Sequence, residues 1–188
     1  ASLGMNYWEN GRVTRRQLSV LAFGLAAVWI VLDQATKWLA VENLEPGTAY
    51  PLIGELFQLR LVYNPGAAFG IGTGFIWILT VIAGAVAIGL GVIATRVATL
   101  RWSLVIGSML GGAVSHFFDR LLRGETLATG KIVDFLDYGG FFVGNIADIA
   151  LVGAAIGAVL LSMFGVPFSE PARREPATSL ASPSDAPR

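Results

Sequence analysis

Two aspartates in apolar surroundings are the residues of this sequence best suited to chemistry. Asp148 is followed by an uncharged run that extends to Glu170, and Asp134 has two apolar residues on each side. Two carboxylates that share a site resist double ionisation, so one holds a proton while the other can accept a proton from water. The pair is therefore a candidate for water activation. Structural carboxylates at a membrane interface, or the acids of an ion path, are the alternatives.

Further polar residues stand at spacings that place them beside one another on helices. Asn145 precedes Asp148 by three residues and so lies on the same helical face. Asp33 and Lys37 are four residues apart, which allows an ion pair along one helix. Ionisable groups within membrane spans are energetically costly and usually functional. The alternative for Asp33 and Lys37 is a pair of side chains that snorkels toward the membrane interface.

Other kinds of catalytic site are excluded by residue counts and spacing. The chain has no cysteine, which excludes disulfides, thiol nucleophiles and thiolate metal sites. Its single histidine, His116, excludes a zinc site built from several histidines, and no metal is expected. Ser115, His116 and Asp119 are residue types of a serine peptidase. However, Ser115 and His116 are neighbours on a helix and point about 100° apart, so they do not form a pair.

The composition is that of a membrane protein. Of the 188 residues, 54% are hydrophobic and only 14% are charged, against roughly 25% charged residues in soluble domains. The net charge is zero, so no nucleic-acid partner is expected. The gaps between charges predict four spanning helices, over residues 17–39, 73–95, 102–120 and 145–166. The first is expected to remain in the protein rather than be removed as a signal peptide, since no clear small-residue cleavage site follows it.

Basic residues in the short flanks of these spans predict their orientation, because such residues stay on the cytoplasmic side. They gather before the first span, between the second and third, and after the fourth: Arg12, Arg15, Arg16, Arg96, Arg101, Arg173 and Arg174. Both termini are therefore expected in the cytoplasm, with outer loops over 40–72 and 121–144. One membrane domain over 17–168 is expected between a cytoplasmic N-terminal segment, 1–16, and a disordered cytoplasmic tail, 169–188.

The first outer loop is expected to form strands. Large apolar residues alternate with mixed ones from Leu56 to Tyr63, and Pro46-Gly47 predicts a turn before them. The predicted fold class is therefore an all-α membrane protein, a four-transmembrane-helix bundle with a small extracytoplasmic β-sheet. Pairs of small residues four apart predict close helix packing: Gly107 with Gly111, Gly153 with Gly157, and Ala85 with Gly89.

The ordered polar blocks of this chain resemble those of the lipoprotein signal peptidases, also called signal peptidase II. The resemblance covers residues 18–164, and each block alone is short. Five blocks occur in the order typical of that family: Val31-Leu32-Asp33-Gln34-Ala35-Thr36-Lys37, Asn64-Pro65-Gly66-Ala67-Ala68-Phe69-Gly70, Asp119-Arg120-Leu121, Val133-Asp134-Phe135 and Asn145-Ile146-Ala147-Asp148.

The resemblance implies an intramembrane aspartic endopeptidase with Asp134 and Asp148 as its catalytic residues. The family's other recurrent polar and glycine positions match Asp33, Lys37, Asn64, Gly66, Arg120 and Asn145. The implied substrate is a bacterial prolipoprotein that carries diacylglycerol on a cysteine, cut immediately before that cysteine. The implied location is the bacterial cytoplasmic (inner) membrane, with membrane lipids as partners. No metal or organic cofactor is needed, a monomer is expected, and the antibiotic globomycin inhibits such enzymes.

One departure from the family pattern concerns His116. The family usually has Gly-Asn where this chain has Ser115-His116, and a milder departure is Ile149 where serine is common. Histidine can still donate and accept hydrogen bonds, although it is larger and can carry charge. We hypothesise that His116 replaces the asparagine as a neutral imidazole, close to Arg120 and to the two aspartates.

Two other classes of protein would also keep polar residues in a membrane. A proton-coupled transporter keeps carboxylates within its helices, but four spans without an internal repeat are few for that function. A non-enzymatic scaffold would explain the small-residue faces but not the ordered polar blocks. Cleavage of a diacylated precursor in detergent distinguishes these classes from a peptidase.

Overall fold

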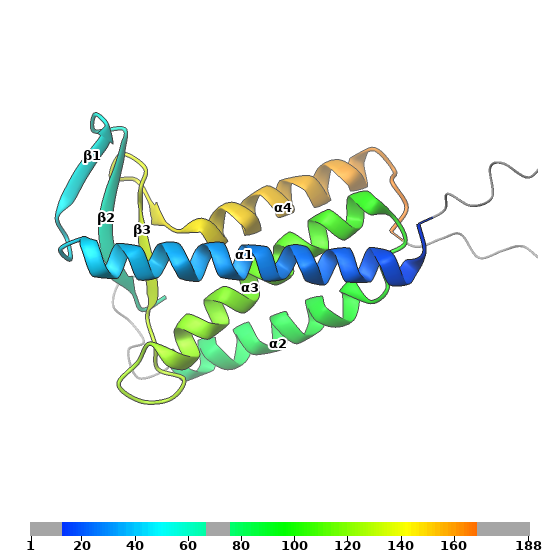
Figure 1. Cartoon of the computed structure of the whole chain (residues 1–188), viewed down its shortest axis with the longest axis horizontal. Helices are drawn as coiled ribbons and strands as arrows, with labels where there is room; N and C mark the ends of the chain where they lie inside the picture. Colours follow the sequence, from blue (N-terminus) through cyan, green and yellow to red (C-terminus); the bar gives the residue numbers. More distant parts are fainter. Residues whose placement is uncertain (1–12, 67–75, 169–188) are drawn as a thin grey trace, which may run out of the picture.

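Four long helices and a small sheet at one end of them make up the protein (Figure 1). The computed structural model describes residues 13–66 and 76–168. The helices are α1 (Arg15–Asn43), α2 (Ile76–Ala94), α3 (Leu100–Leu122) and α4 (Ile146–Met163). All four helices predicted from the charge gaps are confirmed, with ends that differ from the prediction by a few residues. Residues 73–75 of the second predicted helix lie outside the described residues.

Three of these helices, α1, α2 and α4, are long and apolar enough to cross a membrane. In the described part of the chain α3 is not among them, because it is less apolar and has charged residues near both of its ends, Arg101 and Asp119-Arg120. Length and composition therefore support an integral membrane protein with three membrane-capable helices rather than the four predicted. The polar character of α3 has a physical reason, since this helix packs against each of the other three and has the longest buried face.

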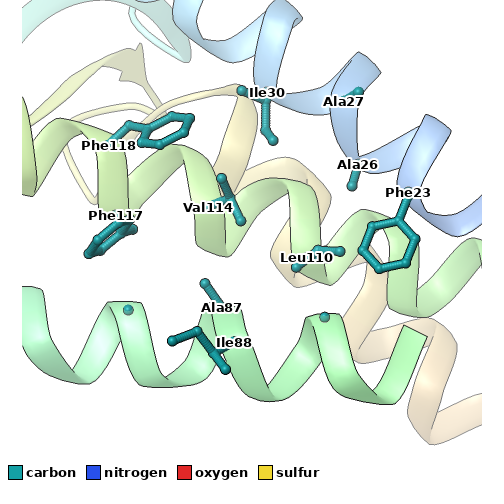
Figure 2. A pocket seen from close by; sticks show the side chains of 12 residues that line it. Phe23, Ala26, Ala27, Ile30, Ala87, Ile88, Leu110, Val114, Phe117 and Phe118 are labelled. Atoms are coloured by element: carbon teal, nitrogen blue, oxygen red, sulfur yellow. The ribbon is translucent and has the colours of Figure 1, made fainter. Parts of the chain in front are cut away.

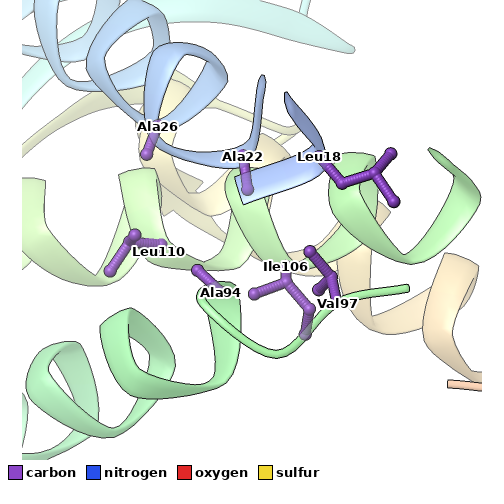
Figure 3. Close-up of a cluster of buried hydrophobic side chains, with 7 residues drawn as sticks. All are labelled: Leu18, Ala22, Ala26, Ala94, Val97, Ile106 and Leu110. Atoms are coloured by element: carbon purple, nitrogen blue, oxygen red, sulfur yellow. The ribbon is translucent and has the colours of Figure 1, made fainter. Parts of the chain in front are cut away.

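Glycines bring α3 into close contact with α1. A Cβ atom at Gly107 would lie 2.6 Å from the carbonyl oxygen of Ala22, and one at Gly111 would lie 2.8 Å from that of Ala26. The close packing predicted for Gly107 and Gly111 is therefore confirmed. Buried apolar side chains continue this contact toward the end of α2, as Figure 3 shows: Leu18, Ala22, Ala26, Ala94, Val97, Ile106 and Leu110.

The prediction of close packing is wrong for two other glycines. A Cβ atom at Gly89 or Gly153 would meet nothing within 4 Å, so these positions face open space. Small residues at helical spacing indicate only that an approach is possible, and here no neighbouring helix makes use of it. Gly157, one turn beyond Gly153, does pack, since a Cβ atom there would lie 3.1 Å from the Val105 side chain.

The sheet is antiparallel, with its four strands in chain order. The strands are β1 (Ala49–Ile53), β2 (Phe57–Asn64), β3 (Ile132–Asp137) and β4 (Val143–Gly144). The strand predicted in the first outer loop is confirmed as β2, and the chain turns at Gly47, where φ is +81°. Every residue of β3 is buried. The sheet thus brings both outer loops together at the end of the bundle where α4 begins (Figure 1).

The bundle holds the beginning of α1 and the end of α4 at its other end, away from the sheet (Figure 1). The side of the membrane on which the two flanking segments lie stays a prediction. The disordered tail predicted over 169–188 and most of the N-terminal segment, residues 1–12, lie outside the described residues. The same is true of residues 67–72 of the first predicted outer loop, of which 67–70 also belong to the second polar block.

Candidate active site

Asp134 lies in β3, where two asparagine side chains from other elements bind its carboxylate. Asn64, the last residue of β2, donates from Nδ2 to Asp134 Oδ2 at 2.9 Å. Asn145, the N-cap of α4, donates from Nδ2 to Asp134 Oδ1 at 2.6 Å. Asp134 is only 3% exposed. Each carboxylate oxygen thus has its own donor, and the two bonds fix the orientation of the carboxyl group.

Asp148 lies in the first turn of α4 and forms part of its cap. Asn145 N donates to Asp148 Oδ2 at 2.9 Å, and Asp148 N donates to Asn145 Oδ1 at 3.1 Å. The N-terminus of a helix favours negative charge, so this position suits an ionised carboxylate. Gly144 leaves room for it, because a Cβ atom there would lie 2.8 Å from Asp148 Oδ2. Asn145 therefore holds both aspartates, one through its side chain and the other through its backbone.

Burial raises the pKa of Asp134 above its ordinary value, and the negative charge of Asp148 acts in the same direction. The hydrogen bonds from Asn64 and Asn145 and the charge of Lys37 oppose this rise. The arrangement can therefore hold one proton on a buried carboxyl group and keep an ionised carboxylate close to it.

His116, in α3, lies beside Asp148, where the sequence predicts it. Its Nε2 lies 3.2 Å from Asn145 Oδ1 and 3.5 Å from Asp148 Oδ1. Because the side-chain nitrogen of Asn145 donates to Asp134, the side-chain oxygen of Asn145 must be the acceptor toward His116. The hydrogen of a neutral His116 imidazole is accordingly assigned to Nε2. His116 thus presents an N–H donor to the site, as an asparagine amide would.

Arg120 is one turn beyond His116 but reaches a different part of the site. Its Nη1 donates to the carbonyl oxygen of Pro65 at 3.3 Å. Gly66 has φ of +76°, and its N–H donates to Asn64 Oδ1 at 2.8 Å. A side chain at Gly66 would collide with the Arg120 guanidinium. Arg120 and Gly66 therefore hold the turn that orients Asn64 toward Asp134.

A cluster of buried charges joins α1 to α3 near the two aspartates. Lys37 Nζ lies 2.6 Å from Asp33 Oδ2 and 2.7 Å from Asp119 Oδ2, and these three side chains are fully buried. Arg123 Nε lies 2.9 Å from Asp119 Oδ1, so two acids face two bases. The predicted ion pair of Asp33 and Lys37 is confirmed. The alternative of a pair that snorkels to the interface is wrong, because neither side chain is exposed.

The sequence of the chain matches one established family over most of its length. The family described as signal peptidase (SPase) II matches residues 25–164. The chain belongs to the signal peptidase II family. Members of this family are aspartic peptidases that cleave the signal peptides of prolipoproteins.

Lipoprotein signal peptidases of several bacteria are similar to this signal peptidase II chain, and the matched region covers most of each relative. The lipoprotein signal peptidase of Mycobacterium avium (strain 104) is 41% identical over 157 residues, which cover 84% of this chain and 86% of the relative. Those of Rhodococcus jostii (strain RHA1) and Bifidobacterium adolescentis are 42% and 38% identical over 80% and 85% of this chain, and over 76% and 84% of the relatives.

Two solved structures described as bacterial membrane enzymes, at 1.9 and 2.3 Å resolution, share the fold. One is 27% identical with a TM-score of 0.64 and the other 28% identical with a TM-score of 0.62. Each comparison covers 76% of this chain, and 92% and 87% of the respective structures. Together with the family match, this likeness rules out the transporter and scaffold interpretations of the sequence.

Sequence reasoning placed the polar residues of this signal peptidase II chain near one another but missed part of the network. Asp119 was set aside as part of an unsuitable serine-peptidase set, yet it binds Lys37. Ser115 donates to Asp33 at 2.6 Å while its neighbour His116 faces α4, which confirms that the two point apart. A signal was available for Asp119, since it is a charged residue within a segment predicted to span the membrane, 102–120.

Among the apolar pockets in the described part of the chain, two of similar volume are relevant to the candidate site. One of about 430 Å³ lies among α1, α2 and α3, and none of the candidate site residues lines it (Figure 2). The other, of about 410 Å³, begins at Asp148 and follows α4. It is lined by Tyr138, Phe142, Asp148, Ile149, Val152, Gly153 and Ile156. Only the second pocket is continuous with an aspartate of the candidate site.

Proposed function

We propose that this protein is an intramembrane aspartic endopeptidase for prolipoproteins. It removes the signal peptides of diacylglyceryl-modified bacterial precursors and cuts just before the lipidated cysteine. The observation that carries this proposal is the double role of Asn145. Its side chain donates to Asp134 at 2.6 Å and its backbone N–H donates to Asp148 at 2.9 Å, so one residue presents both carboxyl groups to the same space. The family to which the chain belongs supplies the substrate class.

The proposed reaction uses the two aspartates as a proton-sharing pair. Asp148, ionised, takes a proton from a water molecule, whose oxygen attacks the scissile carbonyl carbon. Asp134 gives its proton to the carbonyl oxygen, so the product is a neutral tetrahedral diol. As the C–N bond breaks, Asp148 returns its proton to the leaving nitrogen and Asp134 recovers one from the diol. The products are the carboxyl group of the signal peptide and the free amine of the cysteine.

The assignment of the proton to Asp134 follows from the surroundings of the two groups. Asp134 is 3% exposed and its pKa is raised by burial. The Asp148 side chain is 24% exposed and lies at a helix N-terminus, where negative charge is favoured. Water can therefore reach the proposed base directly. Asn64 and Arg120 act as positioning residues, because they hold the carboxyl group and the turn beside it.

We further propose that α3 is the fourth membrane span of a monomer in the inner membrane. At 23 residues it is long enough to cross. The other three helices pack around it, so its polar residues need not face lipid. The flanking arginines favour cytoplasmic termini, which would place the sheet and both aspartates on the outer side. There the pair would meet precursors that have crossed the membrane but remain anchored in it.

The pocket along α4 is proposed to hold an acyl chain of the substrate. It extends from Asp148 to Ile156 over about 12 Å of helix at 1.5 Å per residue. Apart from Asp148, the residues that line it are apolar or aromatic, so an extended hydrocarbon chain can lie along them. An acyl chain seated there would bring the lipidated cysteine, and the bond just before it, toward Asp148.

Cleavage of a defined precursor tests the proposal. The purified protein in detergent is given the same prolipoprotein with and without diacylglycerol on its cysteine, and the products are separated by gel electrophoresis and identified by mass. We expect cleavage immediately before the lipidated cysteine, and little or none of the unlipidated precursor. Equal cleavage of both precursors would contradict the lipid requirement. Absence of cleavage of either would contradict the proposed function itself.

A further inference from the structure

We infer that Asp33 and Asp119, joined by Lys37, set the spacing between the two candidate catalytic aspartates. The inference rests on the proposed function, because that function gives Asp134 and Asp148 their role. Each carboxylate of the cluster accepts the backbone N–H of the residue directly before one aspartate of the pair. The three residues are therefore positioning residues, which do not touch the substrate.

We call each of these two contacts to a backbone N–H an anchor. The first anchor fixes the beginning of α4. Asp33 Oδ1 accepts the backbone N–H of Ala147 at 2.8 Å. This N–H is one of those that a helix leaves without an internal partner in its first turn. The neighbouring one, of Asp148, is bound within the helix cap by Asn145. Asp33, from α1, is thus the tertiary contact that places the backbone directly before Asp148.

The second anchor fixes β3 on the side away from β2, which pairs with Val133 through Tyr63. β4 pairs only with Leu136 and Asp137, so it does not reach the part of β3 that contains Val133. Asp119 Oδ2 instead accepts the Val133 N–H at 3.2 Å, and Asn145 Nδ2 donates to the Val133 carbonyl at 3.3 Å. Side chains from α3 and α4 thus replace the missing strand directly before Asp134.

Lys37 joins the two anchors into one unit. Its ammonium lies 2.6 Å from Asp33 Oδ2 and 2.7 Å from Asp119 Oδ2, with all three side chains fully buried. Ser115 and Arg123 occupy further positions on the two carboxylates, at 2.6 and 2.9 Å. The low dielectric inside a protein strengthens such contacts, so these side chains resist movement relative to one another. The distance between the two backbone anchors is therefore fixed by a single cation.

Replacement of that cation by an uncharged side chain of similar length is the direct test. We expect Lys37→Met to reduce kcat by about 10²-fold, the order of loss caused by a 1 Å misplacement in an active site, and to leave KM within about threefold. The pH–rate profile should also change. Because the charge of Lys37 opposes the rise of the Asp134 pKa, its removal should move the alkaline limb of the profile to higher pH and so widen the profile.

A matched control distinguishes positioning from general stability. Asp137 is also buried in β3, three residues beyond Asp134, but its ion pair is with Arg60 at 2.9 Å. Asp137→Asn removes a buried charge from the same strand without touching either anchor. We expect it to lower the melting temperature while kcat per folded molecule and the width of the pH profile stay unchanged. The same result for Lys37→Met would overturn the inference.

Two variants at Asp119 carry the test if Lys37→Met does not fold. Asp119→Asn keeps an oxygen that can accept the Val133 N–H, whereas Asp119→Ala removes it. We expect kcat to be several-fold higher for the asparagine variant. Equal kcat for the two would show that the anchor has no part in catalysis.

Hydrogen exchange provides a readout that does not depend on catalysis. The Val133 and Ala147 amides should exchange faster in Lys37→Met than in Asp137→Asn, even if the chosen precursor is not cleaved by the wild-type protein. Unchanged exchange at both amides would refute the anchors. Failure of the wild-type protein to cleave any lipidated precursor would refute the proposed function alone.

Discussion

His116 offers the sharpest test of how the site is held, because its contribution can be worked out from two distances. Its Nε2 lies 3.2 Å from Asn145 Oδ1, which is within hydrogen-bond range, and 3.5 Å from Asp148 Oδ1, which is at the limit. We predict that His116→Ala weakens catalysis only moderately. We also predict that His116→Asn retains or improves it, because an asparagine amide supplies the same N–H donor.

The size of the expected loss in kcat/KM follows from the polar groups that remain after His116→Ala. Asn145 Oδ1 still accepts the N–H of Asp148 at 3.1 Å, so no buried acceptor is left without a partner. The His116 side chain is 17% exposed, and water can enter the space that it leaves. The loss should therefore be that of one ordinary hydrogen bond, about 0.5–1.5 kcal/mol, or about 2- to 13-fold in kcat/KM.

The assay compares wild type, His116→Ala and His116→Asn on the same diacylated precursor at fixed pH. Phe118→Leu serves as a control, because Phe118 is on the same helix but lines the pocket away from the aspartates. Equal rates for wild type and His116→Ala would show that the imidazole only fills space. A loss of more than about 10³-fold, beyond the usual worth of one hydrogen bond, would instead make His116 part of the proton transfer.

Three further predictions address the pair, the topology and the acyl pocket. Asp134→Asn and Asp148→Asn should each lower turnover of a lipidated precursor by roughly 10²–10⁴-fold in folded protein; retention of a tenth of the wild-type rate would remove that residue from the mechanism. A cysteine at Thr126 should react with a membrane-impermeant reagent in intact cells, and labelling only after permeabilisation would reverse the orientation. Gly153→Leu should fit the protein, where a Cβ atom meets nothing within 4 Å, but displace the acyl chain and lower kcat up to about 10²-fold by misalignment. Gly89→Leu, at an equally open position, should leave kcat unchanged. Equal rates for the two leucine variants would place the acyl chain elsewhere.

The effect of Gly153→Leu should fall on kcat more than on KM for a reason particular to membranes. Burial of a methylene contributes about 0.8 kcal/mol when it leaves water. An acyl chain expelled from the α4 pocket returns to bilayer or detergent hydrocarbon, which is as apolar as the pocket. The four carbons of leucine therefore remove little binding free energy. They disturb the alignment of the substrate instead, because the lipidated cysteine is no longer held at a fixed distance from Asp148.

Local patterns were enough to predict the four helices and the strands of the first loop, but not β3 or β4. Uncharged runs predicted all four helices, and alternation predicted β2, because each signal lies within one segment. The spacing of Asp33 and Lys37 likewise predicted their ion pair. What no local pattern contains is the partner of a long-range contact. Asp33 accepts the N–H of Ala147 from the far end of the chain, and only the folded arrangement of α1 and α4 brings the two together.

The spacing of glycines alone was not enough to predict which of them contact another helix. Gly107 packs against α1, but Gly153, with the same spacing to a second glycine, faces a pocket. A missing side chain permits close approach of a helix or of a ligand, and the sequence does not distinguish the two. Asp119 shows the opposite case, a contact that exists although spacing did not predict it. Its residue type was noted, but its role depends on Lys37 of another helix, which no spacing within α3 reveals.

The same physical constraint explains why α3, which has no membrane-capable stretch in the described part of the chain, is the centre of the bundle. Charges inside a membrane protein are tolerated when they are paired and shielded from lipid. Asp33, Lys37, Asp119 and Arg123 satisfy the first condition, since two acids face two bases. Asp33, Lys37 and Asp119 satisfy the second, since they are fully buried where α1 and α4 cover one end of α3. The residues that make α3 a poor membrane span by composition are thus the ones that require it to be surrounded by the other helices. That requirement places the candidate site where α3 meets the beginning of α4.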